Sequence, residues 1–531
     1  MESASDYSMA RAARLNHRGL QRCCNSFGDP SRNLVIAATA LPYNIGANHS
    51  PERTKTNLTE LGLLALSASL LTLPTRVAER APVRSPVIDS DSAGMRSVLR
   101  NIARAPKTVE VNLRAATEQM SLVPGVTTSV FAYNGHIPGP TLVVNEGDHV
   151  VVHFTNDLPE PTTVHWHGIH LPFESDGSPF HPIAPGHKRD YVFEVPAGSA
   201  GTYWYHPHPD RRTGFAIGKG LFGGIVVRAP NDPLRDLPEQ LLVLSDNRFL
   251  NDGAVDFADP HSALGSIDEE NGREGPVLFV NGQVNPTIPI RSGEVQRWRI
   301  VNASAGRIYR LALAGQSFLL VGTDGGLIEK PVEMKEIILT TGERAEILVR
   351  GAGAPGSRTV LQNLPYDRYA PQTRPRDWQT TRDLLTLQTS SDAPMKPVTI
   401  PARLRQITPL DTTKVTAVRT VVLGQGMING KLMDMGRIDI STHVGATEIW
   451  QIENVVGMDH PFHLHGFQFQ VLDRDGVREP FLAWKDMLNI PKHSSARIIV
   501  RYDDHPGKWM FHCHILDHED HGMMGVLEVK P

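Results

Sequence analysis

The chain has 531 residues, a formal net charge of −4 and a hydrophobic fraction of 40%. This length suits about three or four domains with an ordinary core, and the lack of a broad basic field argues against nucleic acid as a partner. The 45 glycines and 40 prolines, without long helical periodicity, favour a loop-rich all-β protein.

Residues 1–105 are expected to be a leader followed by an N-terminal arm. Residues 61–73 form an apolar run that follows Arg53 and Lys55 and precedes Pro74. The run is too short for a stable membrane span and has the length of a signal-peptide core, so it predicts export to the periplasm or the medium. Its depth in the chain is unusual for a signal, and a short buried helix is the alternative.

The chain has three cysteines: Cys23, Cys24 and Cys513. If the leader is removed, the mature chain keeps only Cys513. A single thiol excludes an internal disulfide and is free to bind a metal.

Three segments of the chain align without gaps: residues 145–156, 291–302 and 443–454. Each has Gly at the third place, Asn at the twelfth, and apolar residues at the eighth and tenth. The glycine suits a turn that enters a strand, and the alternating apolar residues suit a sheet with one face on a core. The wide spacing indicates a duplication of whole domains rather than a short repeat.

The duplication predicts three similar β-sandwich domains. Pro-rich polar linkers near residues 228–233 and 390–394 supply the boundaries. We therefore expect domains at residues 106–230, 231–395 and 396–531.

The first and third copies carry histidines that the middle copy lacks. Residues 201–208 match residues 507–514, with two histidines in each, whereas residues 356–363 of the middle copy have none. A metal cluster built by the first and third copies must lie at their interface. The middle domain is then expected to be a spacer and a wall.

Four His-x-His pairs occur, whereas chance predicts roughly one among 23 histidines. The pairs are His165 and His167, His206 and His208, His463 and His465, and His512 and His514. Their equivalent places in duplicated domains indicate a shared metal site. Imidazole suits copper, zinc, iron and nickel, so the histidines alone do not identify the metal.

Residues 512–524 supply the identity of the metal. Along a strand, His512 and His514 share one face and Cys513 points to the other, so one strand can serve two metal sites. His518 and Met523 follow Cys513 at five and ten residues. A Cys with two His and a weak Met is the ligand set of a blue-copper centre, so copper is predicted.

With these motifs the sequence resembles a three-domain multicopper oxidase of the laccase and cuprous-oxidase type, over about residues 106–531. The motifs are His-Trp-His-Gly, Trp-Tyr-His-Pro-His, His-Pro-Phe-His-Leu-His-Gly and His-Cys-His-x3-His-x4-Met. The resemblance implies an all-β chain of three cupredoxin-like Greek-key β-sandwiches in tandem, with a copper cluster between domains 1 and 3.

The resemblance also implies roles for the ligands of four copper ions. The type 1 ligands would be His460, Cys513, His518 and Met523. The type 2 ligands would be His165 and His463. The type 3 ligands would be His167, His206 and His514 for one ion, and His208, His465 and His512 for the other.

The implied reaction is one-electron oxidation of a small reducing substrate at type 1 copper, coupled to four-electron reduction of O2 to water. Cys513, between His512 and His514, would carry electrons between the sites. Asp176 and Glu519 match family positions that relay protons, and carboxylates near cations suit that role. Ordinary solvation of two loops is the alternative for these carboxylates.

The leading prediction is a laccase-like oxidase of phenolic donors, acting as a monomer. A metallo-oxidase for Cu(I) or Fe(II), or a bilirubin-oxidase-like activity, is the alternative within the same class. The 14 methionines are scattered, which weakens the Cu(I) alternative because soft thioethers favour that ion. Copper sequestration and a structural relative are the competing classes, and both predict tolerance of lost ligands.

Overall fold

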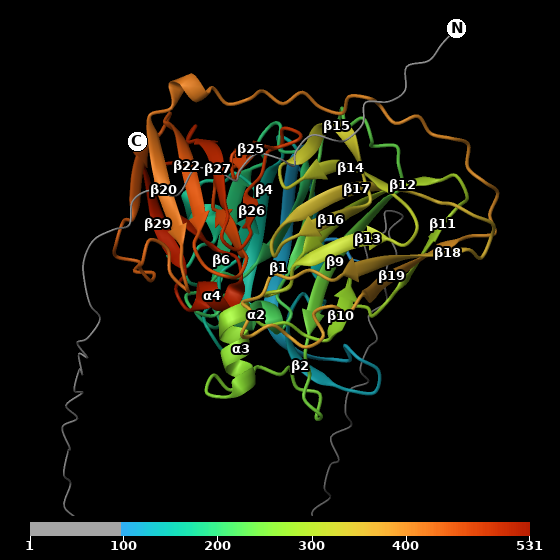
Figure 1. Cartoon of the computed structure of the whole chain (residues 1–531), viewed down its shortest axis with the longest axis horizontal. Helices are drawn as coiled ribbons and strands as arrows, with labels where there is room; N and C mark the ends of the chain where they lie inside the picture. The colour runs from blue at the N-terminus through green and yellow to red at the C-terminus, as the bar shows by residue number, and fades with distance from the viewer. Residues whose placement is uncertain (1–96) are drawn as a thin grey trace, which may run out of the picture. The chain divides into compact units, whose positions relative to one another are not determined.

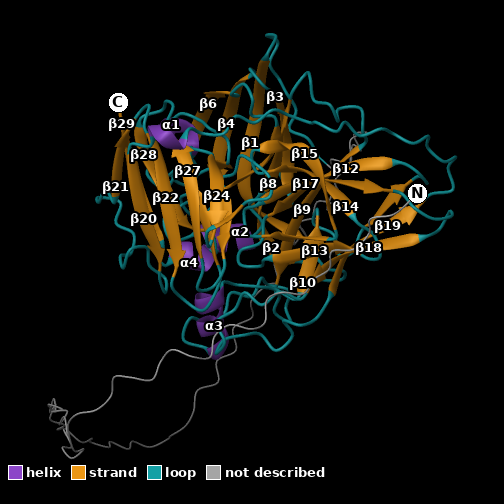
Figure 2. Cartoon of the chain, turned by 45° about the horizontal axis from the view of Figure 1, so that its top comes forward, coloured by secondary structure: helices purple, strands orange, loops and turns teal. Residues whose placement is uncertain are grey.

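The computed structural model describes residues 97–531, and strands make up most of the regular structure there (Figure 2). The apolar run at residues 61–73, Cys23 and Cys24 lie outside this range. Among the described residues, no helix has the length and apolar character needed to cross a membrane. The predicted all-β class is confirmed.

The first unit consists of two four-stranded sheets, with strand orders β2-β1-β4-β6 and β3-β8-β7-β5. Its elements are β1 (Thr108–Met120), β2 (Thr128–Tyr133), β3 (Gly139–Asn145), β4 (His149–Asp157), β5 (His165–His167), α1 (Phe173–Asp176), β6 (Lys188–Glu194), β7 (Gly201–His206), α2 (Thr213–Gly218) and β8 (Gly223–Arg228). The aromatic side chains of Trp166, Tyr191 and Tyr205 are buried in its core.

The second unit has a six-stranded sheet, β10-β9-β12-β17-β14-β15, and a five-stranded sheet, β11-β19-β18-β13-β16. Its elements are β9 (Glu239–Asn247), α3 (Ala263–Asn271), β10 (Val277–Val280), β11 (Thr287–Ile290), β12 (Val295–Asn302), β13 (Tyr309–Leu313), β14 (Phe318–Thr323), β15 (Gly326–Met334), β16 (Glu336–Leu339), β17 (Arg344–Arg350), β18 (Arg358–Leu364) and β19 (Arg382–Thr389).

The third unit has two five-stranded sheets, β20-β22-β27-β24-β25 and β21-β29-β28-β23-β26. Its elements are η1 (Thr412–Lys414), β20 (Ala417–Leu423), β21 (Ile440–His443), β22 (Thr447–Asn454), β23 (His460–Leu464), β24 (Phe469–Arg474), β25 (Val477–Arg478), β26 (Met487–Ile490), β27 (Ser495–Arg501), β28 (Gly507–Cys513), α4 (Leu516–Asp520) and β29 (Met524–Lys530).

The three aligned segments form β4, β12 and β22, one in each unit. The glycine before each strand has a positive φ, at 79° for Gly147, 78° for Gly293 and 86° for Gly445, which a side chain would disfavour. The asparagines at the strand ends, Asn156, Asn302 and Asn454, are buried and donate their side-chain amides to backbone carbonyls. The repeat therefore encodes a turn at one end of a strand and a buried polar anchor at the other.

The predicted domain limits at 230/231 and 395/396 fall in stretches without strands, between β8 and β9 and between β19 and β20. These limits stay a prediction.

Three short helices from the three units, α2, α3 and α4, lie side by side (Figure 1). One end of the third unit is thereby covered by helices of the other two.

Candidate metal centre

Two strand pairs bring eight histidines together. In the first unit β5 pairs with β7, which sets His165 opposite His206; in the third unit β23 pairs with β28, which sets His463 opposite His512. The remaining four cluster histidines, His167, His208, His465 and His514, follow two residues later in each strand or just beyond its end. All eight are at most 1% exposed.

The histidines of the first and third units interleave. The ring of His165 stacks on His465 at 4.0 Å, and the ring of His167 stacks on His463 at 3.9 Å and 11°. This arrangement places the histidine cluster where the first and third units meet.

Hydrogen bonds at Nδ1 orient most of these rings. The Nδ1 atoms of five rings face oxygen atoms at 2.7–3.0 Å, so each Nδ1 carries the hydrogen and each Nε2 presents a lone pair. The five are His165, His206, His463, His465 and His512.

His167 is reversed. Its Nε2 lies 3.1 Å from Oδ1 of Asp486, so Nε2 donates and Nδ1 faces the Nε2 of His206 at 3.3 Å. Likewise, the Nε2 atoms of His465 and His512 face each other at 3.0 Å. Two lone pairs repel each other at such distances, so both pairs fit a shared cation.

Further ring nitrogens of the cluster lack any hydrogen-bond partner within residues 97–531. They are Nε2 of His165 and His463 and both nitrogens of His208 and His514. Buried polar atoms without partners are costly, and neutral imidazole nitrogens are what copper prefers. The residues therefore fit the predicted copper ions.

Burial keeps these imidazoles in the neutral, ligating form. It lowers the pKa of His165 to about 3 and that of His512 to about 4, and it holds the pKa of the other six well below the usual value for histidine. Protonated histidines would not share so small a buried volume without a large cost.

The nitrogen positions define groups of three that could each hold an ion. The predicted type 3 set of His208, His465 and His512 is one such group. His165, His167 and His206 form another such group, and the His514 ring lies 5.0 Å from His167 and 5.8 Å from His206.

A separate site lies on the other face of β28. Sγ of Cys513 is 3.4 Å from Nδ1 of His460 and 3.5 Å from Nδ1 of His518. Met523 is fully buried in the same core cluster, and its backbone carbonyl accepts a hydrogen bond from Cys513 at 3.1 Å. Burial raises the pKa of the Cys513 thiol to about 12, so a cation is needed to hold it as a thiolate.

Two buried carboxylates adjoin the histidines. Asp176 accepts from His165 with its backbone oxygen and from His465 with its carboxylate at 3.0 Å, and burial raises its pKa to about 8. Glu519 lies 3.2 Å from Nδ1 of His512 and 3.4 Å from Nε2 of His208, outside hydrogen-bonding geometry. Burial raises the pKa of Glu519 well above its usual value.

Sequence reasoning missed Asp486. Its carboxylate contacts His167, and its backbone oxygen accepts from His463 at 2.9 Å. Asp486 is paired with Arg344 of the second unit, so the middle domain is more than the predicted spacer and wall. No spacing pattern surrounds Asp486, which simply precedes a short buried strand.

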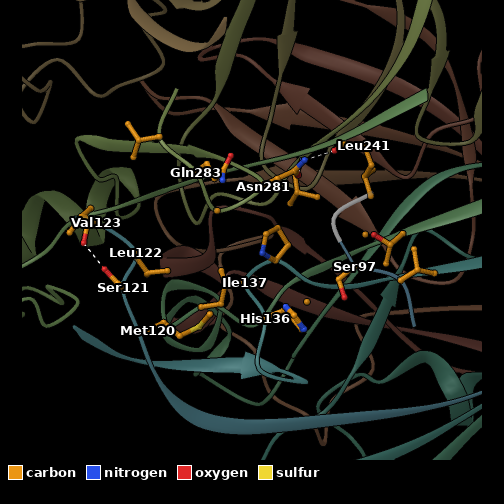
Figure 3. Close-up of a pocket in the computed structure, with 18 of the residues that line it drawn as sticks. Ser97, Met120, Ser121, Leu122, Val123, His136, Ile137, Leu241, Asn281 and Gln283 are labelled. Carbon is orange, nitrogen blue, oxygen red and sulfur yellow. Dashed lines mark hydrogen bonds between the residues drawn. The ribbon is translucent and has the colours of Figure 1, made fainter. Parts of the chain in front are cut away.

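Two large cavities differ in their relation to these sites. One of about 610 Å³ is lined by His460, His518, Met458 and Glu269. A larger one of about 700 Å³ includes Ile137 and Asn281, and Figure 3 shows these side chains around it. No proposed copper ligand lines the larger cavity, whereas His460 and His518 line the smaller one.

Known proteins share this architecture over most of the chain. Three family models described as multicopper oxidase match residues 114–232, 248–388 and 401–531. The multicopper oxidase mco of Staphylococcus aureus is 32% identical, over 78% of this chain and 88% of that protein. The laccase of Bacillus subtilis is 27% identical, over 79% and 94%.

A solved multicopper oxidase from Campylobacter jejuni, described as a metallo-oxidase, superposes with a TM-score of 0.75 at 34% identity. It covers 82% of this chain and 94% of its own. Fold and site together define a copper-dependent oxidoreductase with cupredoxin-like domains. The chain belongs to the multicopper oxidase family.

Proposed function

We propose that this chain is a laccase-like oxidase in which twelve residues hold four copper ions. The type 1 ligands are His460, Cys513, His518 and Met523, and the type 2 ligands are His165 and His463. The type 3 ligands are His167, His206 and His514 for one ion and His208, His465 and His512 for the other. The partnerless buried ring nitrogens carry this proposal, because bound cations satisfy all of them together.

Copper, when bound, supplies one-electron oxidation of the donor and four-electron reduction of O2 to water. The chain supplies the connection, because Cys513 faces one site while its neighbours His512 and His514 face the other. Asp176 and Glu519 hold protons beside the cluster, where water formation consumes them.

The donor is proposed to be a phenol or a similar small reductant in the cavity of about 610 Å³. Val455, Val456 and Pro371 give that cavity apolar walls suited to an aromatic ring. A second candidate is oxidation of Cu(I) or Fe(II), favoured by Met458, Glu269 and Glu270 in the same cavity and by the metallo-oxidase from Campylobacter jejuni.

Oxygen uptake by the copper-loaded protein separates these candidates. A panel of a methoxyphenol, bilirubin, Cu(I) and Fe(II) should give the largest kcat/KM with the phenol. A blue protein that consumes O2 only with metal ions would replace the laccase-like proposal by the metallo-oxidase. Copper binding without O2 uptake on any donor would exclude an oxidase role.

We also propose that the protein is exported and acts as a monomer. The apolar run at residues 61–73 supports export, although it lies outside the described residues. Cell fractionation tests location, and light scattering on the purified chain tests the oligomeric state. Retention in the cytoplasm, or a stable dimer, would contradict the respective statement.

A further inference from the structure

The turn at residues 340–343, between β16 and β17, reaches the histidine cluster from the second unit. Thr341 donates its hydroxyl to the backbone carbonyl of His514 at 2.7 Å. Gly342, with φ +78°, lies so close that a Cβ atom there would stand 2.9 Å from Nε2 of His514. The second unit has no proposed copper ligand of its own, but it contacts His514, which is a proposed ligand.

Arg344 follows this turn as the first residue of β17, and all five N–H groups of its guanidinium have acceptors. Nε donates to the carbonyl of Thr202 at 3.2 Å, and Nη1 donates to the carbonyl of Gly342 at 3.0 Å and to Asp486 at 2.7 Å. Nη2 donates to the carbonyl of Asp324 at 3.1 Å and to the second oxygen of Asp486. Lysine has three donors on one atom and cannot reproduce this fork.

Asp486 orients two imidazole rings through hydrogen bonds. Its Oδ1 accepts from Nε2 of His167, which leaves Nδ1 of His167 facing the cluster. Its backbone oxygen accepts from Nδ1 of His463, which leaves Nε2 of that ring facing the cluster. The opposite orientations of these stacked rings therefore depend on one residue.

We propose that Arg344 is a positioning residue of the oxygen-reducing cluster, holding Asp486 so that His167 presents Nδ1 and His463 presents Nε2. The inference rests on the ligand assignment proposed above. Without the guanidinium, the Asp486 carboxylate loses the two donors that fix its plane. His167 then loses the acceptor that selects its ring orientation, and the ring can turn over.

Arg344→Lys and Asp486→Asn, each loaded with copper, test this role. Partners that orient metal-bound histidines typically contribute about tenfold to a hundredfold in metal affinity. We expect the bound copper and the type 2 electron paramagnetic resonance signal to fall by that order under competition with a chelator. The blue type 1 absorption should persist, because Cys513 and its partners do not contact Arg344.

Arg297→Lys is the matched control. Arg297 is equally buried, in the neighbouring strand β12, and its guanidinium is paired with Glu346 and Asp232 rather than with Asp486. Its replacement should lower the melting temperature like Arg344→Lys while leaving both copper signals at the parent level. A purely structural role for Arg344 would make the two variants alike.

The inference is overturned if Arg344→Lys keeps the full type 2 signal under chelation, or loses type 1 and type 2 copper in parallel. Asp486→Asn keeps the shape of the side chain and decides the matter if Arg344→Lys yields no folded protein. If the parent protein has no type 2 signal, the ligand assignment is wrong. That outcome would contradict the proposed function and not the role of Arg344.

Discussion

The Nε2 of His518 lies 2.9 Å from the backbone carbonyl oxygen of Glu270, so a helix of the second unit covers this imidazole. Because Nδ1 of His518 faces Cys513, Nε2 carries the hydrogen and donates it to Glu270. The C-terminal part of α3 is held there by Gln372, whose amide donates to the Glu270 carboxylate at 2.7 Å. The cavity beside α3 is the side from which we propose that the donor approaches.

Gly457 lies on the wall of that cavity and offers a way to block it. A Cβ atom at Gly457 would meet only His493 and Pro371 at 3.7 Å, which is ordinary contact. Gly457→Phe should therefore fill the space without disturbing the copper ligands, and should raise the KM for a phenol by about tenfold or more, which corresponds to the loss of about 1.4 kcal/mol or more of binding. Steady-state kinetics measures this, with Gly457→Ala as the control that adds only a methyl group. An unchanged KM in the Phe variant would place the donor elsewhere.

Cys513→Ser should abolish the blue colour and slow donor oxidation by at least about a hundredfold, because a serine hydroxyl does not replace a thiolate towards copper. The fold should persist, since the exchange removes little volume from the core. Absorption spectra and circular dichroism of the copper-loaded variant provide the measurement. Cys513 is the free cysteine of the described chain, so a blue variant would show that the type 1 assignment is wrong.

His165→Ala and His463→Ala should disturb the oxygen-reducing cluster and spare the type 1 band. Each variant lacks one Nε2 atom that faces the cluster, whereas the side chains of His460, Cys513 and His518 are unchanged. Bound copper should fall and O2 reduction should slow by at least about tenfold, as for other lost ligand contacts. Copper analysis and the visible spectrum check this. A colourless variant that still carries its full copper would contradict the separation of the two sites.

Much of this site was predictable from spacing alone. The duplicated Gly and Asn positions predicted β4, β12 and β22, and the His-x-His pairs predicted which strands meet, because these features are local in sequence. Arg344 contacts Asp486, and the Glu270 carbonyl contacts His518, across more than 140 residues of the chain, and a backbone carbonyl has no residue signature. Such partners are set by the packing of the three units and require the structure.

The copper-free protein should lose stability as pH falls below about 6.5. Ten buried histidines have lowered pKa values and bind protons only after unfolding, so acid favours the unfolded state between pH 6.5 and about 4. Five carboxylates with raised pKa values act in the opposite sense but are outnumbered: Asp176, Asp459, Asp517, Glu519 and Asp520.

Calorimetry of the chelator-treated protein at pH 7.5, 6.5 and 5.5, chosen as roughly one-unit steps across the histidine range, measures the effect. The melting temperature should fall between pH 6.5 and 5.5, where the unfolded chain takes up protons on its histidines. Restored blue colour on copper addition at the highest pH shows that the starting protein is intact. A melting temperature that rises on acidification would mean that the carboxylates dominate.

Glu519→Gln should slow O2 reduction while donors still reduce the type 1 site. Glu519 is buried within 3.2 Å of His512 and 3.4 Å of His208, and glutamine keeps its shape but cannot exchange a proton in the same role. Loss of one positioned acid typically costs about a hundredfold to ten-thousandfold in the step it serves. The type 1 site should then stay reduced during turnover, because the donor delivers electrons faster than the cluster can transfer them to O2.

Stopped-flow mixing of the reduced variant with O2 measures the slowed step directly. Asp520→Asn is the matched control, because Asp520 adjoins Glu519 but accepts hydrogen bonds from the backbone N–H groups of Thr213 and Gly214 on its two carboxylate oxygens, of which asparagine keeps one as an acceptor. It should reoxidise at the parent's rate. If Glu519→Gln does so too, protons reach the cluster through Asp176 or water alone, and Glu519 only fills space between the two histidines.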